Sequence, residues 1–211
     1  MMDTIQKAGP FAAFTNAVVA IATLYVALVM IGPDALTDQN KFVEIAVSNP
    51  TSLYIQDMLK FISAACGIVL VIVLYRRLQK EAALRMKVAF LFGVLSILLL
   101  LSNTILSLLT TSQAAELAAT KSESGSQLNN IIGMVAMAAI FTNGIWYLLI
   151  SWTALKSSAL PKAVNYLGLV IGVIFLVPML AIIGLLLNVV WSFLLGRTLS
   201  QEIKMTRQSR L

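Results

Sequence analysis

The chain has 211 residues, of which 59% are hydrophobic and 11% charged, and its net charge is +6. Soluble globular domains carry roughly 25% charged residues, so this chain has too few charges to cover a surface that faces water. The composition therefore excludes a soluble protein and predicts one all-α transmembrane domain over residues 1–211, without a separate extramembrane domain.

Six apolar segments are predicted to cross the membrane, because a helical span needs about 20 mostly apolar residues. In chain order they are residues 11–31, 53–75, 88–109, 131–152, 161–177 and 180–198. A cleaved signal peptide would have an apolar core of about 7–15 residues, so the longer first run indicates a retained span. The polar segment 34–52 predicts a short amphipathic helix on the membrane surface, with an apolar side formed by Leu36, Phe42, Val43 and Val47.

The last apolar stretch, residues 164–195, is too long for one ordinary span and short for two, and Pro178 lies near its middle. As one long helix it would give five spans and an external tail. As a hairpin it would place the tail inside, with the basic loops 76–87 and 153–163. Cytoplasmic loops accumulate Lys and Arg, and the tail carries four such residues: Arg197, Lys204, Arg207 and Arg210. We therefore predict a bundle of six spans with both termini cytoplasmic, and five spans as the alternative.

Five polar residues within the predicted spans are candidates for coupling to an ion or a substrate: Asp57, Lys60, Asn103, Asn143 and Asn188. Ionisable groups in a membrane are costly and are functional candidates for that reason. Asp57 and Lys60, however, stand three residues apart on one helical face, where they can neutralise each other, and near a helix end from which side chains can reach the interface. A structural role is therefore the favoured interpretation of this pair.

A polar stripe follows one face of the third span and consists of Ser96, Asn103, Ser107 and Thr110. Such a stripe can line a pathway, but it more often joins helices through hydrogen bonds. Packing is likewise favoured for Asn143 and Asn188. The tryptophans Trp146, Trp152 and Trp191 are expected to act as anchors at the membrane interface.

Small residues at helical spacing predict close contacts between helices. They are Ala13, Ala17, Ala20 and Ala27 on the first span, Ser63 and Gly67 on the second, and Gly168 and Gly172 on the fifth. Such residues can drive dimers, but in a protein with several spans they more often serve internal packing.

Several short motifs mark the beginnings and ends of the predicted spans. Asp57 opens the second span, which leaves the membrane at Leu74-Tyr75-Arg76-Arg77-Leu78, and Leu160-Pro161 leads to Leu167-Gly168-Leu169. The closing WSFLLGRTL completes the pattern. In these features the chain resembles the uncharacterised bacterial membrane family named domain of unknown function 4386. The resemblance covers most of the chain and implies six spans in a bacterial inner membrane, with no assigned activity.

Catalysis is not expected, because the chain has no histidine and a single cysteine, Cys66. For the same reason neither a metal nor a cofactor is expected. The basic residues flank apolar segments, which indicates contact with anionic headgroups and no nucleic-acid partner.

Two function classes stay open. The first is an accessory, assembly or interaction component that packs against other membrane subunits or a second copy of itself. The second is a small-molecule or ion transporter or channel, with a polar path past Asp57, Lys60, Asn103 and Asn143. Binding of a lipid or pigment in grooves between spans is a third possibility.

Overall fold

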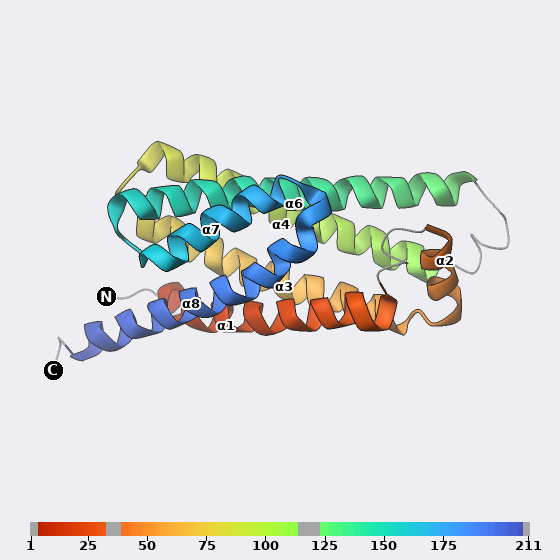
Figure 1. The fold of residues 1–211 in the computed structure, drawn as a ribbon, viewed down its shortest axis with the longest axis horizontal. Coiled ribbons are helices and arrows are strands. Elements are labelled where there is room, and N and C mark those ends of the chain that lie inside the picture. Colours follow the sequence, from red (N-terminus) through yellow and green to blue (C-terminus); the bar gives the residue numbers. More distant parts are fainter. Residues whose placement is uncertain (1–3, 33–38, 114–122, 209–211) are drawn as a thin grey trace.

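The computed structural model describes residues 4–32, 39–113 and 123–208, and every regular element within these ranges is helical (Figure 1). The elements are α1 (Thr4–Tyr25), the π-helical η1 (Val26–Ile31), α2 (Gln39–Ser48), α3 (Thr51–Leu78), α4 (Ala83–Ser112), α6 (Glu123–Ser157), α7 (Lys162–Phe175), the short 3-10 helix η2 (Pro178–Leu180) and α8 (Ala181–Gln208). The predicted all-α helix bundle is confirmed.

Five of the described helices are long and apolar enough to cross a membrane. They are Ile5–Ile31, Thr51–Leu78, Ala83–Ser112, Asn130–Ser157 and Ala181–Met205. At a rise of 1.5 Å per residue, each exceeds the roughly 30 Å of hydrocarbon in a bilayer. The chain is therefore a multi-pass membrane protein.

The last apolar stretch is broken where the sequence predicts a break. Helix α7 ends at Phe175, and after η2 the chain returns as α8, which packs along α7 (Figure 1). Pro178 has no backbone N–H and disfavours a helical residue before it, which favours a break in the helix at this point. The alternative of one long helix over residues 164–195 is wrong.

The two arms of this hairpin differ in length. Helix α7 has 14 residues and is therefore about 21 Å long, which is less than the thickness of the hydrocarbon layer. Helix α8 has 28 residues. The turn between them lies about midway along the long helices (Figure 1). Of the two segments that the sequence predicts as fifth and sixth spans, only the second is long enough to cross by itself.

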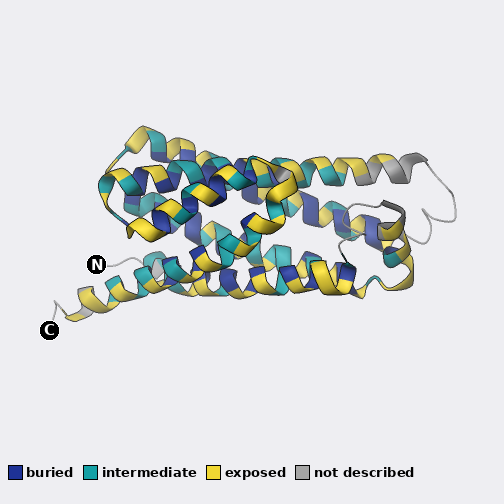
Figure 2. Cartoon of the chain, in the orientation of Figure 1, coloured by how far each residue is buried: buried dark blue, intermediate teal, exposed yellow. Residues whose placement is uncertain are grey.

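The helices form a closed ring in which neighbours pack in the order α1, α3, α4, α6, α7 and α8, and α8 returns to α1. Buried and exposed residues alternate along the described parts of the long helices (Figure 2), as expected where each helix packs one side against its neighbours. The largest fully buried side chains include Leu74, Leu78, Met86, Ile150, Ile171, Trp191 and Leu195. Many outward side chains are also apolar, among them Phe11, Leu91, Met134 and Phe193, as expected where lipid covers the surface.

The beginning of α1 and the end of α8 lie at the same end of the bundle, together with the α3–α4 and α6–α7 connections (Figure 1). We call this the basic end. Its described basic residues are Lys7, Arg76, Arg77, Lys80, Arg85, Lys87, Lys156, Lys162, Arg197 and Lys204. Here Arg77 of α3 binds the Glu202 carboxylate of α8 and the Ala159 carbonyl oxygen, which joins three parts of the chain.

Helix α2 lies at the opposite end of the bundle and confirms the short helix predicted within residues 34–52 (Figure 1). Of its predicted apolar side, Val47 is exposed. Leu36 and the side chains of Phe42 and Val43 lie outside the described part of the chain.

Candidate functional site

Two separate polar regions lie inside the bundle. The first, which we call the charged cluster, consists of Asp57 and Lys60 on α3 and Asn103 on α4. Lys60 Nζ donates hydrogen bonds to Asp57 Oδ1 at 2.8 Å and to Asn103 Oδ1 at 3.1 Å. Asn103 Nδ2 in turn donates to the Ile132 carbonyl oxygen on α6 at 2.9 Å. The cluster therefore ties three helices together.

Burial explains why the two charges of this cluster must pair. The Asp57 side chain is 1% exposed and that of Lys60 is 23% exposed. Burial of an isolated charge at this position would be strongly unfavourable because the charge loses its hydration, and the ion pair offsets part of that loss. Lys60 is therefore turned inward toward Asp57 and Asn103.

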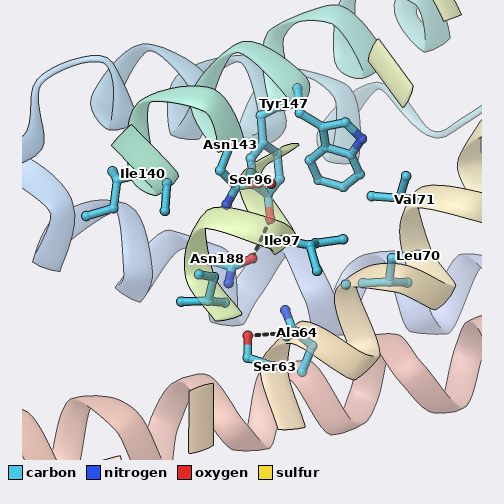
Figure 3. A pocket seen from close by; sticks show the side chains of 15 residues that line it. Ser63, Ala64, Leu70, Val71, Ser96, Ile97, Ile140, Asn143, Tyr147 and Asn188 are labelled. Carbon is cyan, nitrogen blue, oxygen red and sulfur yellow. Dashed lines mark hydrogen bonds between the residues drawn. The ribbon is translucent and has the colours of Figure 1, made fainter. Parts of the chain in front are cut away.

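The second region surrounds a central cavity of about 140 Å³. Its wall is formed by residues of α1, α3, α4, α6 and α8 (Figure 3). The polar residues of the wall are Asn16, Ser63, Ser96, Asn143, Tyr147 and Asn188. None of the described residues that line the cavity carries a charge.

Hydrogen bonds join four helices beside this cavity. We call Asn16, Ser63, Tyr147, Asn188 and Ser192 the uncharged network. Asn16 Nδ2 donates to Ser192 Oγ at 3.0 Å, and Ser63 Oγ donates to Asn16 Oδ1 at 3.3 Å. Asn188 Oδ1 accepts a hydrogen bond from Tyr147 OH at 2.6 Å (Figure 3) and another from Ser192 Oγ at 3.2 Å. The network fixes α8 against α1 and α6.

Aromatic rings pack next to this network. The ring centroids of Tyr147 and Trp191 are 4.8 Å apart, and those of Trp146 and Trp191 are 6.2 Å apart. Trp146 is 4% exposed and Trp191 1%, so the prediction that they anchor the membrane interface is wrong. Gly93 of α4 makes room for the Trp146 ring, since a β-carbon at Gly93 would come 2.7 Å from it. Trp152 does face outward and is 46% exposed.

The small residues noted in the sequence lie at internal contacts. A β-carbon at Gly168 would come 2.1 Å from Ser151 Oγ, and one at Gly172 would come 2.7 Å from the Leu148 side chain, both on α6. At Gly67 the nearest atom would be on Ile97, at 3.4 Å. On α1, three alanines are buried and one is half-buried: Ala13, Ala17 and Ala20, followed by Ala27.

The candidate coupling residues are divided between the two regions. Asn143 and Asn188 line the cavity, whereas Asp57, Lys60 and Asn103 do not. On the polar stripe of α4, Ser96 Oγ and Thr110 Oγ1 donate to backbone carbonyls of their own helix, and Ser107 is buried. Among the described residues, the four that would form the predicted path are not brought into one cavity.

The sequence interpretation did not single out Asn16 or Ser192, and it placed Tyr147 in an aromatic belt at the membrane interface, whereas Tyr147 is 3% exposed and all three residues hold the uncharged network together. Asn16 and Ser192 each stand in a long apolar run, where a polar side chain needs a partner. This signal could have marked them as interior residues. It could not have paired them, because they are 176 positions apart in the chain.

No curated protein and no solved structure gives a match to the chain. A family model does match, over residues 11–201, which include α3, α4, α6 and α7 in full and most of α1 and α8. The chain therefore belongs to the family described as Domain of unknown function (DUF4386).

Proposed function

We propose that this protein is a non-enzymatic membrane component that acts by packing its helices against other membrane proteins. The observation that carries the proposal is the charged cluster, whose three side chains bind one another and the Ile132 carbonyl inside the bundle. Polar groups used in this way serve helix packing, and they leave apolar faces toward the membrane. The absence of histidine from the chain also argues against acid–base catalysis.

A photo-crosslinking scan in cells tests this proposal. A photoreactive amino acid is placed at one outward position on each of three helices, Phe11 of α1, Met134 of α6 and Phe193 of α8, which are 76%, 61% and 55% exposed. We expect one of these faces to capture a single protein in stoichiometric yield while the other two capture lipid. The inward position Ile150 is the matched control, since it is 1% exposed. Capture of lipid alone from all three faces would overturn the proposal.

Transport is the second candidate, and the central cavity with Asn143 in its wall is the observation that favours it. The path would pass Asp57, Lys60, Asn103 and Asn143. The charged cluster lies outside the cavity wall, so a continuous path would require these groups to rearrange. Purified protein in liposomes tests this candidate. Uptake of a solute that Asp57→Asn and Asn143→Leu both abolish would favour transport over the packing role.

We also propose that the basic end faces the cytoplasm of a bacterium, with the protein in its inner membrane. Cytoplasmic loops carry the excess of Lys and Arg, and basic loops there can bind anionic headgroups. Reporters of sidedness placed after α8 and in the α3–α4 connection are expected to give the same cytoplasmic signal. An external signal from the reporter after α8 would contradict this orientation.

A further inference from the structure

The central cavity has the size of a small organic molecule. Its volume is about 140 Å³, and a cavity of roughly 150 Å³ in another protein is large enough to hold benzene. The space is therefore sufficient for a ligand of about six to eight non-hydrogen atoms.

The lining determines which chemistry such a ligand can have. None of the described residues in the wall is charged, so an ion placed there would lose its hydration without gaining a partner of opposite charge. Much of the wall is apolar, with Leu70, Ile97 and Ile140 as examples, and the ring of Tyr147 also faces the space (Figure 3). These features select an uncharged molecule with an apolar body.

Hydrogen-bonding capacity is left over on two asparagines of the wall. The hydroxyl groups of Tyr147 and Ser192 both donate to Asn188 Oδ1, and the amide nitrogen Nδ2 of Asn188 donates to no residue that the structure describes. Asn143, in the same wall, forms no hydrogen bond with any described residue, so its carboxamide offers a donor and an acceptor. Both side chains are half-buried in the wall of the cavity, and a ligand oxygen would supply the partners that these groups lack within the described protein.

From these observations we propose that the central cavity is a binding site for a small uncharged molecule that carries a hydroxyl or carbonyl oxygen on an apolar body. The oxygen accepts a hydrogen bond from Asn188 Nδ2 or from Asn143, and a hydroxyl hydrogen is donated to Asn143 Oδ1. The molecule is either a free solute or the end group of a longer membrane lipid. The site does not depend on which proteins pack against the outside of the bundle.

Fluorine NMR on the full-length protein in detergent tests the site with 4-fluorophenol as the probe. Fluorobenzene and 4-fluorobenzoate, which lack the hydroxyl group or carry a charge, are the comparison probes. We expect a separate bound signal for 4-fluorophenol, weaker binding of fluorobenzene and no bound signal from 4-fluorobenzoate. If 4-fluorophenol gives only its micelle signal, the cavity holds water alone and the proposal fails.

Variants locate the bound probe within the protein. Asn143→Leu removes the free carboxamide at similar size, and one lost hydrogen bond should weaken 4-fluorophenol binding by roughly three- to tenfold while fluorobenzene binding is retained. Ala139→Leu fills part of the space and should abolish binding of both probes, since Ala139 is a buried residue of the wall. Asn130→Leu, at an exposed position on the same helix, is the matched control and should change nothing. Equal 4-fluorophenol binding by all three variants would overturn the proposal.

Native mass spectrometry distinguishes the two sources of the ligand. If protein purified from membranes carries a lipid that 4-fluorophenol displaces, and Ala139→Leu lacks that lipid, the site takes the end group of a lipid. If the probe binds without displacing any lipid, the site takes a free solute. Either result supports the site, whereas a bound lipid that 4-fluorophenol cannot displace and Ala139→Leu retains would place the lipid elsewhere.

Discussion

The charged cluster and the uncharged network lie in the same bundle but satisfy their polar groups in different ways. In the cluster, Lys60 and Asn103 donate to acceptors within the protein, and the ion pair engages Asp57 through Oδ1, while Asp57 Oδ2 is buried without a hydrogen-bond partner among the described residues. In the network, Asn188 keeps a free donor and the neighbouring Asn143 is unused by the described residues. A buried charge requires a close partner because its desolvation is so costly, whereas a neutral amide can be left facing a cavity.

The largest expected effect comes from breaking the ion pair. Lys60→Met leaves the Asp57 carboxylate, 1% exposed, without its partner. Removing one member of a buried pair costs about 3 kcal/mol in the free energy of unfolding, which detergent-to-SDS titration measures. The double variant Asp57→Leu/Lys60→Met removes both charges and should recover most of the loss. A double variant as unstable as Lys60→Met alone would show that the pair does not set the stability of this region.

A steric change beside the uncharged network should have the next largest effect. Gly144 lets α6 approach α7 closely, and a β-carbon there would come 2.9 Å from the Gly172 carbonyl oxygen, a backbone atom that cannot rotate away. Gly144→Ala should therefore lower the free energy of unfolding by about 1–3 kcal/mol, as overpacking does, and displace the adjacent Asn143.

Gly133→Ala is the matched control for this substitution. It lies on the same helix, and its β-carbon would have nothing within 4 Å. Alanine favours a helix over glycine by about 1 kcal/mol, so this variant should be neutral or slightly more stable. Equal losses at both positions would mean that the contact between α6 and α7 does not matter.

The sequence was sufficient to predict features that depend on local chemistry. The long apolar runs predicted the helices, Pro178 predicted the break between α7 and α8, and the spacing of Asp57 and Lys60 predicted their pairing on one helical face. Each of these follows from residues close together in the chain, and from the cost of unpaired polar groups in lipid.

What could not be predicted depends on how distant helices rotate toward each other. Trp146 and Trp191 lie in the second halves of the predicted spans 131–152 and 180–198, which fits an interface position as well as the interior. The interior position of Trp146 depends on Gly93 of α4, which leaves space for the Trp146 ring. Likewise, nothing in either segment indicates that Asn16 and Ser192 meet. Hydrophobic periodicity predicts which face of a helix is buried, but it does not predict which other helix packs against that face.

A single hydroxyl group tests how strongly the uncharged network holds α6 to α8. Tyr147→Phe removes the donor that lies 2.6 Å from Asn188 Oδ1, while Ser192 Oγ still donates to the same oxygen. Because one acceptor bond remains, we expect a loss of about 1 kcal/mol in the free energy of unfolding. Tyr166→Phe, at a position 57% exposed, is the control and should change stability by less than the error of the titration. If Tyr147→Phe and Tyr166→Phe had the same free energy of unfolding, the Tyr147 hydrogen bond would not contribute to stability.

The smallest effect is expected at Asn143, and it separates the cavity from the rest of the network. Asn143→Leu removes no hydrogen bond that the described residues make, so the ligand-free protein should change by less than about 0.5 kcal/mol in its free energy of unfolding. Asn188→Leu makes the same chemical change in the same cavity wall but leaves Tyr147 and Ser192 without their acceptor, and it should cost about 1–3 kcal/mol. If Asn143→Leu proved as costly as Asn188→Leu, its carboxamide would already be engaged within the protein. The cavity would then lack the open hydrogen-bonding group that distinguishes it from the charged cluster.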